Sequence, residues 1–133
     1  MKSQNEIIED FEVFDDWMEK YQYIIDLGKE LDELDAADKT EENKLQGCQS
    51  QVWIIHEVID GKLIFKAQSD AAIVSGLVAL VLSVYSGKTP KEIAKTKPKF
   101  ITKIGLDKHL SPTRSNGLSS LLSKIQETAK AYS

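Results

Sequence analysis

One stretch of the sequence decides the fold class: Val52-Trp53-Ile54-Ile55-His56-Glu57-Val58-Ile59-Asp60-Gly61-Lys62-Leu63-Ile64-Phe65-Lys66-Ala67. Residues 52–59 are rich in β-branched and aromatic side chains, which favour a strand. Asp60-Gly61 supplies the positive φ angles that a two-residue hairpin turn requires. Residues 62–67 alternate apolar and lysine side chains, with Ile64 as the exception, as a half-exposed strand does. The pattern predicts an antiparallel hairpin. Its first strand is apolar on both faces and therefore central, which leaves room for a third strand.

Helical patterns precede this hairpin. Residues 5–20 carry apolar side chains at steps of three and four, Met18 among them, which indicates an amphipathic helix. The pattern continues to Leu31, with Gly28 near its end. Residues 32–44 are polar and aperiodic, so we expect an acidic surface loop between the helices and the hairpin.

A buried helix is predicted directly after the hairpin. Ser69 is a suitable N-cap for a helix from about Asp70 to Ser86, and Gly87 follows as a stop signal. This segment is apolar nearly all round, so the helix should be covered on several sides. Gly76 within it allows another element to approach closely.

Two further helix starts follow. Thr89-Pro90-Lys91-Glu92 is a capping box with proline at the first helical position, and Ser111-Pro112 opens the terminal helix. Two helices, a hairpin and three helices predict an α+β fold, a small antiparallel sheet packed by helices, in a single domain over residues 1–133. The apolar stripe of the terminal helix consists of Leu118, Leu121, Leu122, Ile125 and Ala129.

The composition is that of one soluble globular domain. The chain has 133 residues, of which 41% are hydrophobic and 29% charged, with a net charge of −4. That charge argues against non-specific nucleic-acid binding, which needs basic residues to displace counterions. Residues 1–47 carry a net −10 and residues 48–133 a net +6. This asymmetry indicates two differently solvated faces or a surface that steers a protein partner; the seven lysines of residues 88–108 allow the same two interpretations.

Neither end nor middle of the chain suggests a membrane. The N-terminus becomes acidic at Glu6, unlike a secretory signal. The one long apolar stretch, residues 71–85, is shorter than the roughly 20 residues that a spanning helix needs. We therefore expect a cytoplasmic protein.

Cys48 is the first candidate for chemistry. A single cysteine cannot form an internal disulfide, a Cys-x-x-Cys redox pair or a cysteine-rich metal site. Its neighbours Gly47 and Gln49 place it in a polar loop rather than in an apolar run, where structural cysteines usually lie. A presented, reactive thiol and an inert one remain equally open, and its pKa depends on neighbours that sequence cannot place.

Arg114 is the second candidate. It is the chain's one arginine, and it lies in the first turn after Ser111-Pro112, where a cation opposes the helix dipole. Its planar fork suits a carboxylate, either of a partner or within the chain, for example that of Asp70. Asp70 itself is first a helix-start residue and second a polar site group.

The two histidines carry weaker signals. His56 alternates with core residues and favours a packed, hydrogen-bonded histidine, whereas His109 lies in a predicted loop and is open to either interpretation. Cys48, His109 and Asn116 could form the triad of a cysteine hydrolase, but spacing alone does not establish the geometry. No ligand spacing supports zinc on Cys48, His56 and His109, so we expect no metal site.

Four ordered blocks of the sequence resemble the SufE family of sulfur acceptors. The cysteine motif is Leu45-Gln46-Gly47-Cys48-Gln49-Ser50-Gln51-Val52-Trp53, and the similarity runs from about residue 10 to the end of the chain. One departure is Asp32, where relatives commonly have proline. The other three blocks are Tyr21-Gln22-Tyr23-Ile24-Ile25-Asp26-Leu27-Gly28, Ser69-Asp70-Ala71-Ala72-Ile73-Val74 with Gly76-Leu77, and Leu110-Ser111-Pro112-Thr113-Arg114-Ser115-Asn116-Gly117-Leu118.

The resemblance implies a sulfur carrier rather than an enzyme. In such proteins the thiolate, here Cys48, takes sulfur from the persulfide of a cysteine desulfurase (SufS or CsdA-like), stimulates that enzyme, and passes the sulfur to the SufBCD scaffold for iron–sulfur cluster assembly. Pyridoxal phosphate belongs to the desulfurase, so no cofactor is expected here. The implied fold is shared with IscU-type scaffolds, whose extra cluster-building cysteines this chain lacks.

The resemblance also assigns site residues. Cys48 is the acceptor, Asp70 and Arg114 match motif positions around the cysteine loop, and Gln49 and His109 lie in matched segments. Arg114 is then expected to anchor the partner or stabilise the thiolate. Asp70 is expected to hold the cysteine loop at rest until the desulfurase draws it out. The resemblance leaves open which desulfurase is served and whether the chain is a monomer or a weak homodimer.

Two other functions fit the residues. A cysteine hydrolase using Cys48 and His109 predicts burst kinetics with an activated ester and no second protein. A passive protein-interaction adaptor, docking through its charged faces, predicts that Cys48→Ser keeps all activity.

Overall fold

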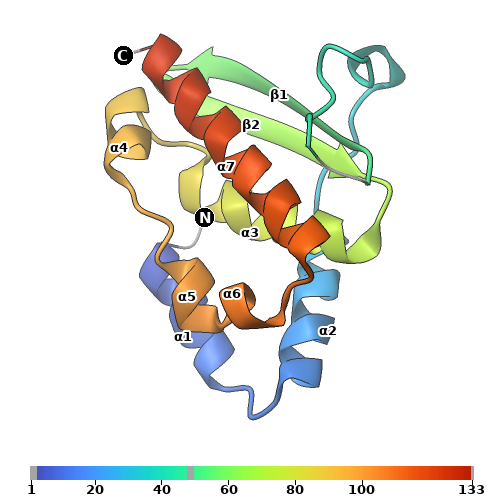
Figure 1. The fold of residues 1–133 in the computed structure, drawn as a ribbon. Helices are drawn as coiled ribbons and strands as arrows, with labels where there is room; N and C mark the ends of the chain where they lie inside the picture. Colours follow the sequence, from blue (N-terminus) through green and yellow to red (C-terminus); the bar gives the residue numbers. More distant parts are fainter. Residues whose placement is uncertain (1–2, 48–49, 133) are drawn as a thin grey trace.

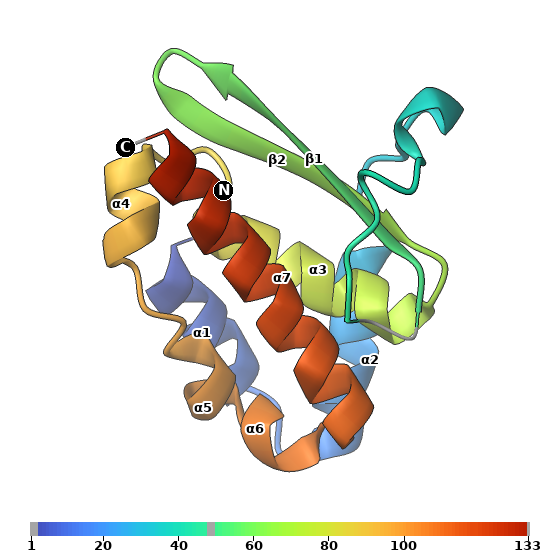
Figure 2. The same ribbon diagram turned by 45° about the horizontal axis from the view of Figure 1, so that its top comes forward.

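A two-stranded hairpin and a central apolar helix organise the molecule (Figure 1). The structure, a computed structural model, describes residues 3–47 and 50–132. Figures 1 and 2 show helix α7 crossing in front of α3. The hairpin lies above these two helices, and α1 and α2 lie on the side away from the hairpin. The elements are α1 (Gln4–Glu12), α2 (Trp17–Gly28), the 3₁₀ helix η1 (Ala36–Asp38), β1 (Val52–Ile59), β2 (Lys62–Ser69), α3 (Ala72–Tyr85), α4 (Pro90–Lys95), α5 (Phe100–Ile104), α6 (Leu106–His109) and α7 (Pro112–Ala131).

The hairpin has the predicted register and turn. β1 and β2 pair antiparallel with His56 opposite Phe65, and Asp60 and Gly61 have φ angles of 52° and 78°. Leu63, Phe65 and Ala67 of β2 are buried in alternation, as expected. The α+β class is therefore confirmed.

The central position predicted for β1 is wrong. The sheet in the described part of the chain has two strands, and the room for a third is filled only by an isolated bridge between Lys44 and Trp53. Residues 56–59 at the outer end of β1 are exposed. Their apolar side chains extend past the helices that cover the inner end, so hydrophobicity on both faces does not mark a strand with neighbours on both sides.

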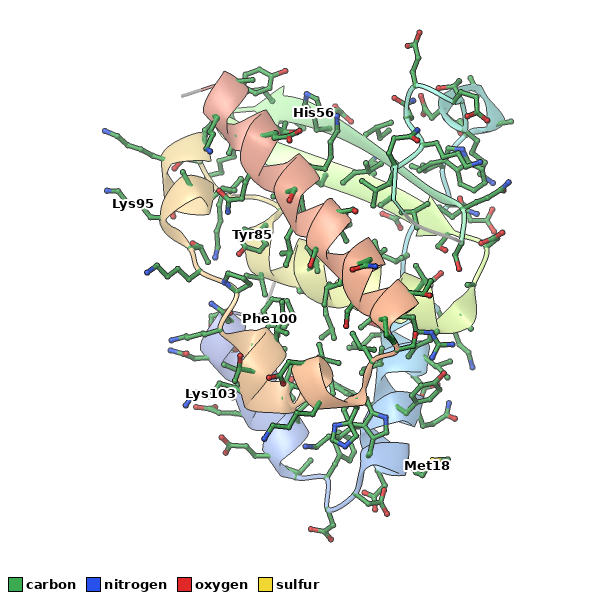
Figure 3. All side chains as sticks on the ribbon, viewed as in Figure 1. Met18, His56, Tyr85, Lys95, Phe100 and Lys103 are labelled. Atoms are coloured by element: carbon green, nitrogen blue, oxygen red, sulfur yellow. The ribbon has the colours of Figure 1, made fainter. Side chains whose placement is uncertain are left out.

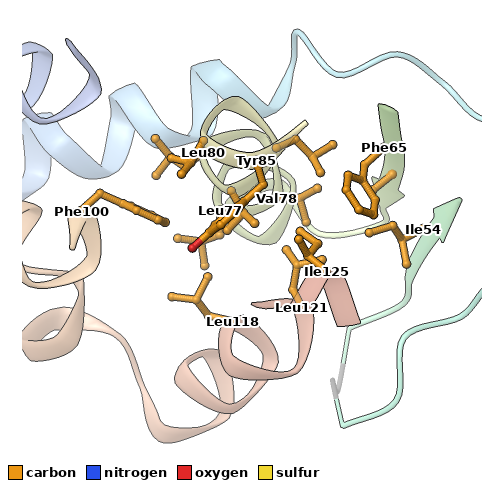
Figure 4. Packing of buried hydrophobic residues seen from close by; sticks show 14 of the residues in the cluster. Ile54, Phe65, Leu77, Val78, Leu80, Tyr85, Phe100, Leu118, Leu121 and Ile125 are labelled. Atoms are coloured by element: carbon orange, nitrogen blue, oxygen red, sulfur yellow. The ribbon is translucent and has the colours of Figure 1, made fainter. Parts of the chain in front are cut away.

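Helix α3 lies at the centre of the core, as its apolar character predicts. Figure 4 shows its Leu77, Val78, Leu80 and Tyr85 between side chains from the hairpin, α5 and α7. Gly76 permits the closest approach, because a Cβ there would overlap the carbonyl oxygen of Ile24 in α2. Helices α2 and α3 therefore touch backbone to backbone.

The single helix predicted over residues 5–20 is two helices. α1 ends at Glu12, and α2 begins after Asp16, whose carboxylate accepts a hydrogen bond from the Glu19 N–H at 2.9 Å. The chain turns between them, so that the rings of Phe11 and Tyr23 meet edge to face at 5.1 Å. Met18, which we expected on the apolar face, is 75% exposed and points away from the molecule (Figure 3). A capping aspartate overrides the continuous periodicity.

The predicted start of the buried helix is two residues early. Ser69 belongs to β2, where it pairs with Val52, and its hydroxyl accepts from the Ala71 N–H at 3.3 Å. Helix α3 begins at Ala72, and its N-cap residue, Ala71, contributes no side-chain cap. Ser69 is therefore paired in the strand, although local capping rules assign it to the start of the helix.

The later helix starts are as predicted, but the sequence missed two short helices. Thr89 and Glu92 form both hydrogen bonds of the capping box of α4, and the Ser111 hydroxyl accepts from the Arg114 N–H at 3.3 Å to open α7. Helices α5 and α6 lie between them, in the lysine-rich stretch. Their buried anchors are Phe100, Ile104 and Leu106.

The polar segment 32–44 is a surface loop, as expected, with one exception. Leu34 is buried, and its N–H donates to the side-chain oxygen of Gln68 in β2 at 2.8 Å. Within residues 3–47 and 50–132, no helix is long and apolar enough to cross a membrane.

Candidate functional site

The site is built around the loop of residues 46–51, which contains Cys48. Cys48 and Gln49 lie outside the described residues, so the structure does not test the predictions for them. The base of the loop is closed by two backbone hydrogen bonds, from Leu45 N to Val52 O at 2.7 Å and from Ile54 N to Asn43 O at 2.9 Å. The core strand β1 therefore fixes where the loop begins and ends.

Helix α7 contacts the entry to this loop. Gly47 has a φ angle of 87°, a conformation that side-chain-bearing residues rarely adopt. A Cβ at Gly47 would also lie 2.6 Å from the Ser120 hydroxyl oxygen. The backbone conformation of the residue directly before Cys48 in the chain thus favours glycine, and its neighbour on α7 is a side chain that a change of rotamer can move.

Asp70 holds the other side of the loop. Its carboxylate Oδ1 accepts from the Gln51 N–H at 3.1 Å, and its own N–H donates to the Gln51 carbonyl oxygen at 3.3 Å. This two-way contact joins the loop to the β2–α3 connection. The arrangement agrees with the role expected for Asp70, which stays a prediction until loop release is measured.

A small apolar pocket of about 40 Å³ lies between this loop, α3 and α7. From the loop, Ser50 lines this pocket, and among the described lining residues Arg114 is the one that is charged. That volume is enough for a water-sized group and too small for an organic substrate. The remaining lining residues are Leu45, Val52, Val74, Leu77, Val78, Thr113, Gly117, Leu118 and Leu121.

Arg114 is held by a tyrosine rather than by a carboxylate. Its Nη1 donates to the phenol oxygen of Tyr21 at 3.2 Å, and its guanidinium carbon lies 6.0 Å from the centre of the same ring. No carboxylate in the described ranges forms an ion pair with Arg114, so the internal salt bridge with Asp70 considered from the sequence is absent. The Asp70 carboxylate instead accepts a hydrogen bond from the backbone N–H of Gln51.

His109 lies in a helix rather than in the predicted loop. It ends α6, where its Nδ1 is 2.9 Å from the Gly105 carbonyl oxygen. Its ring stacks on Trp17 with a centroid distance of 4.2 Å and an interplanar angle of 13°. No hydrogen bond joins it to Asn116 in the part of the chain that the structure describes, so the hydrolase triad gains no support from the described contacts.

His56 is exposed rather than packed in the core, but it is hydrogen-bonded. Its Nε2 lies 3.0 Å from the Tyr132 hydroxyl, on the exposed outer half of the hairpin. Among residues 3–47 and 50–132, no group of three or more histidines, cysteines or acids could hold a metal ion. The expectation of no metal site at Cys48 remains a prediction.

Sequence reasoning missed three residues that the structure brings to the site: Trp17, Tyr21 and Ser120. The periodicity assigns Tyr21 to a core stripe, although a tyrosine one helical turn after Trp17 puts both rings on one face of α2. That face meets the segment from His109 to Arg114. The i, i+4 spacing of the two aromatic residues was the available signal.

Comparisons with known proteins agree with the resemblance. Residues 5–129 match the family model described as SufE, an Fe-S metabolism associated domain. An uncharacterized SufE-like protein of Rhizobium meliloti strain 1021 is 46% identical, covering 98% of this chain and 96% of its own. One from Rhizobium etli is 48% identical, covering 98% and 91%. The solution structure of a hypothetical protein from Thermus thermophilus shares the fold, with a TM-score of 0.79 at 18% identity, covering 97% of this chain and 94% of its own.

Proposed function

This chain belongs to the SufE family, whose domain is associated with Fe-S metabolism, and we propose that it is the persulfide carrier of a cysteine desulfurase, with Cys48 as the acceptor. Family membership implies interaction with such a desulfurase in Fe-S metabolism. The proposal adds the residue, the step and the destination of the sulfur.

The proposed step is an exchange at sulfur without net redox change. The Cys48 thiolate attacks the outer sulfur of the desulfurase persulfide, and a new S–S bond forms on Cys48. The S–S bond of the desulfurase breaks, and its electron pair leaves with the enzyme's cysteine thiolate. The terminal sulfur keeps its proton or releases it to solvent. Cys48 then carries one sulfur atom to the next acceptor, which we propose is the SufBCD scaffold.

A single observation carries the proposal: hydrogen bonds to β1 close the base of the cysteine loop, and the side-chain contacts described at its two sides are a carboxylate and a serine hydroxyl. The Leu45–Val52 hydrogen bond keeps the ends of the loop together. Asp70 binds Gln51 on one side and Ser120 touches Gly47 on the other. These contacts can break without disturbing the core, so a partner can draw the loop out while the fold persists.

The absence of a second thiol supports a carrier role. Cys48 is the one cysteine of the chain, so a persulfide formed on it cannot be discharged by an internal disulfide. We therefore favour transfer between proteins, with the desulfurase supplying pyridoxal phosphate.

Arg114 is the charged group best placed to act on the loop. It lines the same pocket as Ser50, so its side chain lies beside the loop, with its guanidinium held at Tyr21. A cation near a thiol favours the thiolate, and the planar donor fork also suits a carboxylate of a docking partner. We propose that Arg114 serves the transfer through one of these two interactions.

The test is the intact mass of the protein after incubation with a SufS-type desulfurase and free cysteine. The wild type is expected to gain one sulfur that reductant removes, and Cys48→Ser is expected to gain none. Stimulation of the desulfurase by the wild type alone completes the proposal. If the wild type gains no mass although the desulfurase is shown to be active, the proposal is contradicted. A burst of product from an activated ester would then favour a hydrolase. Full stimulation of the desulfurase by Cys48→Ser would favour an adaptor.

A further inference from the structure

We propose that Tyr21 is the positioning residue that aims Arg114 at the cysteine loop, an inference that rests on the proposed function. Tyr21 lies in α2, whereas Arg114 lies in the first turn of α7, 93 positions away in the chain. The two side chains form a hydrogen bond beside the small apolar pocket that Ser50 and Arg114 line. Tyr21 does not line that pocket, so it acts through Arg114 and not on sulfur directly.

Two contacts of different geometry fix the guanidinium. The hydrogen bond from Nη1 to the Tyr21 phenol oxygen, at 3.2 Å, sets the direction of the fork. The Tyr21 ring, with its centre 6.0 Å from the guanidinium carbon, offers its negatively polarised face to the cation. Together they define both where the cation lies and how it is turned, which one contact alone does not.

The helix that carries Tyr21 is itself rigidly placed. One turn earlier, Trp17 stacks on His109, and Lys20 Nζ donates to the Ile104 carbonyl oxygen at 3.2 Å. At the other end of α2, a Cβ at Gly28 would lie 2.6 Å from the backbone nitrogen of Gly76 in α3. Helix α2 is therefore packed closely against α3 and against the segment before α7, which places Tyr21 next to Arg114.

Arg114 needs such a support. Its place in the first turn of α7 puts a cation at the positive end of the helix dipole. Of its guanidinium nitrogens, only Nη1 has a hydrogen-bond partner within residues 3–47 and 50–132. The phenol thus holds one donor of the fork and leaves the others to face the loop or an arriving partner. Without it, a long side chain in an unfavourable field would explore many rotamers.

The functional experiment is a double-mutant cycle on the single-turnover rate of sulfur transfer to Cys48, followed by intact mass. Tyr21→Phe keeps the ring and loses the hydrogen bond, and should slow transfer about three- to tenfold. Tyr21→Leu loses both contacts and should slow transfer more. In an Arg114→Ala background neither change should slow transfer further. Tyr132→Phe is the matched control, because its phenol binds His56 at the far end of α7, and it should transfer at the wild-type rate.

A second readout does not depend on sulfur transfer. Arg114 is the chain's one arginine, so the protein has a single arginine side-chain Nε–H resonance in a ¹⁵N NMR spectrum. Tyr21→Phe should shift this resonance and lower its order parameter, and Tyr132→Phe should leave it unchanged.

The outcomes separate the two proposals. If the wild type gains no sulfur, the proposed function fails, and the resonance still reports whether Tyr21 orders Arg114. If the wild type transfers normally but the Tyr21 variants slow transfer equally with and without Arg114, the positioning role is wrong. An arginine resonance that is insensitive to Tyr21 also overturns it. A Tyr21 effect that disappears in the Arg114→Ala background, together with a shifted resonance, supports it.

Discussion

Two glycines in this protein each touch another element, and the atoms that they touch differ in kind. Gly76 faces the backbone carbonyl of Ile24, in the contact between α3 and α2. Gly47 faces the hydroxyl of Ser120, a side chain on α7. A backbone in a packed helix pair cannot move aside, whereas a serine hydroxyl moves with a change of rotamer.

The difference separates the part of the molecule that must stay fixed from the part that must open. Around Gly76 the contacts are backbone to backbone and buried. At the cysteine loop, the contacts described are the Ser120 hydroxyl at Gly47 and, across the loop, the two hydrogen bonds between Asp70 and Gln51. The proposed carrier function needs this combination, because the cysteine loop has to leave while the α2–α3 pair keeps Tyr21 and Arg114 in place.

The largest effect is expected from Gly76→Ala. The added Cβ overlaps the Ile24 carbonyl, so α2 and α3 must separate, at a cost of about 3 kcal/mol or more in unfolding free energy. Urea denaturation followed by circular dichroism measures this. Gly61→Ala is the control, since no atom lies near its Cβ and only its positive φ opposes the change, for about 1 kcal/mol. Equal losses in the two variants would contradict a rigid α2–α3 contact.

Gly47→Ala should lower the free energy of unfolding less than Gly76→Ala does, and it should change the opening of the cysteine loop more. The positive φ opposes alanine by about 1–2 kcal/mol, and the Ser120 hydroxyl can rotate away. We expect faster alkylation of Cys48 by iodoacetamide, because the strained loop opens more often. Adding Ser120→Ala should restore part of the wild-type rate. A loss of stability as large as that of Gly76→Ala would show that the loop is part of the rigid core.

Asp70→Lys should release the loop with little global effect. The change removes the acceptor of the Gln51 N–H and puts an ammonium in its place, so Cys48 alkylation should accelerate severalfold. Asp15→Lys makes the same charge change at an exposed carboxylate between α1 and α2 and serves as the control. Unchanged alkylation in the Asp70 variant contradicts the holding role.

The smallest effect concerns pH at α4, far from both glycines. The Thr89 side chain and backbone donate hydrogen bonds that hold the pKa of Glu92 below its ordinary value of 4.5. A carboxyl with a lowered pKa in the folded state stabilises the protein above pH 4.5, and this contribution is lost as the pH falls through the folded pKa. The stability difference between wild type and Glu92→Gln should therefore shrink in urea titrations as the pH falls below 4.5. Cys48 alkylation should be the same in both proteins.

Local rules predicted the elements whose signals lie within a few residues. The Asp60-Gly61 turn, the Thr89–Glu92 capping box and the Ser111 start of α7 all form as expected. Local rules failed where two signals competed. The periodicity over residues 5–20 gave way to the Asp16 cap, and strand pairing took Ser69 from the helix.

The site divides in the same way. Chemistry and motif order identified Cys48, Asp70 and Arg114 as candidates from the sequence, and the structure places the last two beside the cysteine loop. The support of Arg114 by Tyr21 joins residues that are 93 positions apart in the chain. No local pattern encodes that pair, because it exists only where α2 meets the start of α7.

By itself, the sequence determined the hairpin, the capped helices, the apolar central helix and the family resemblance, since each depends on neighbouring residues or on motif order. The tertiary structure alone decided that β1 has a bare outer half, that Asp70 binds Gln51 rather than Arg114, and that Tyr21 holds the single arginine. The reason is physical: hydrogen-bond partners across long separations depend on which helices pack together. The close approach of α2 and α3 at Gly28 and Gly76 is one such packing contact.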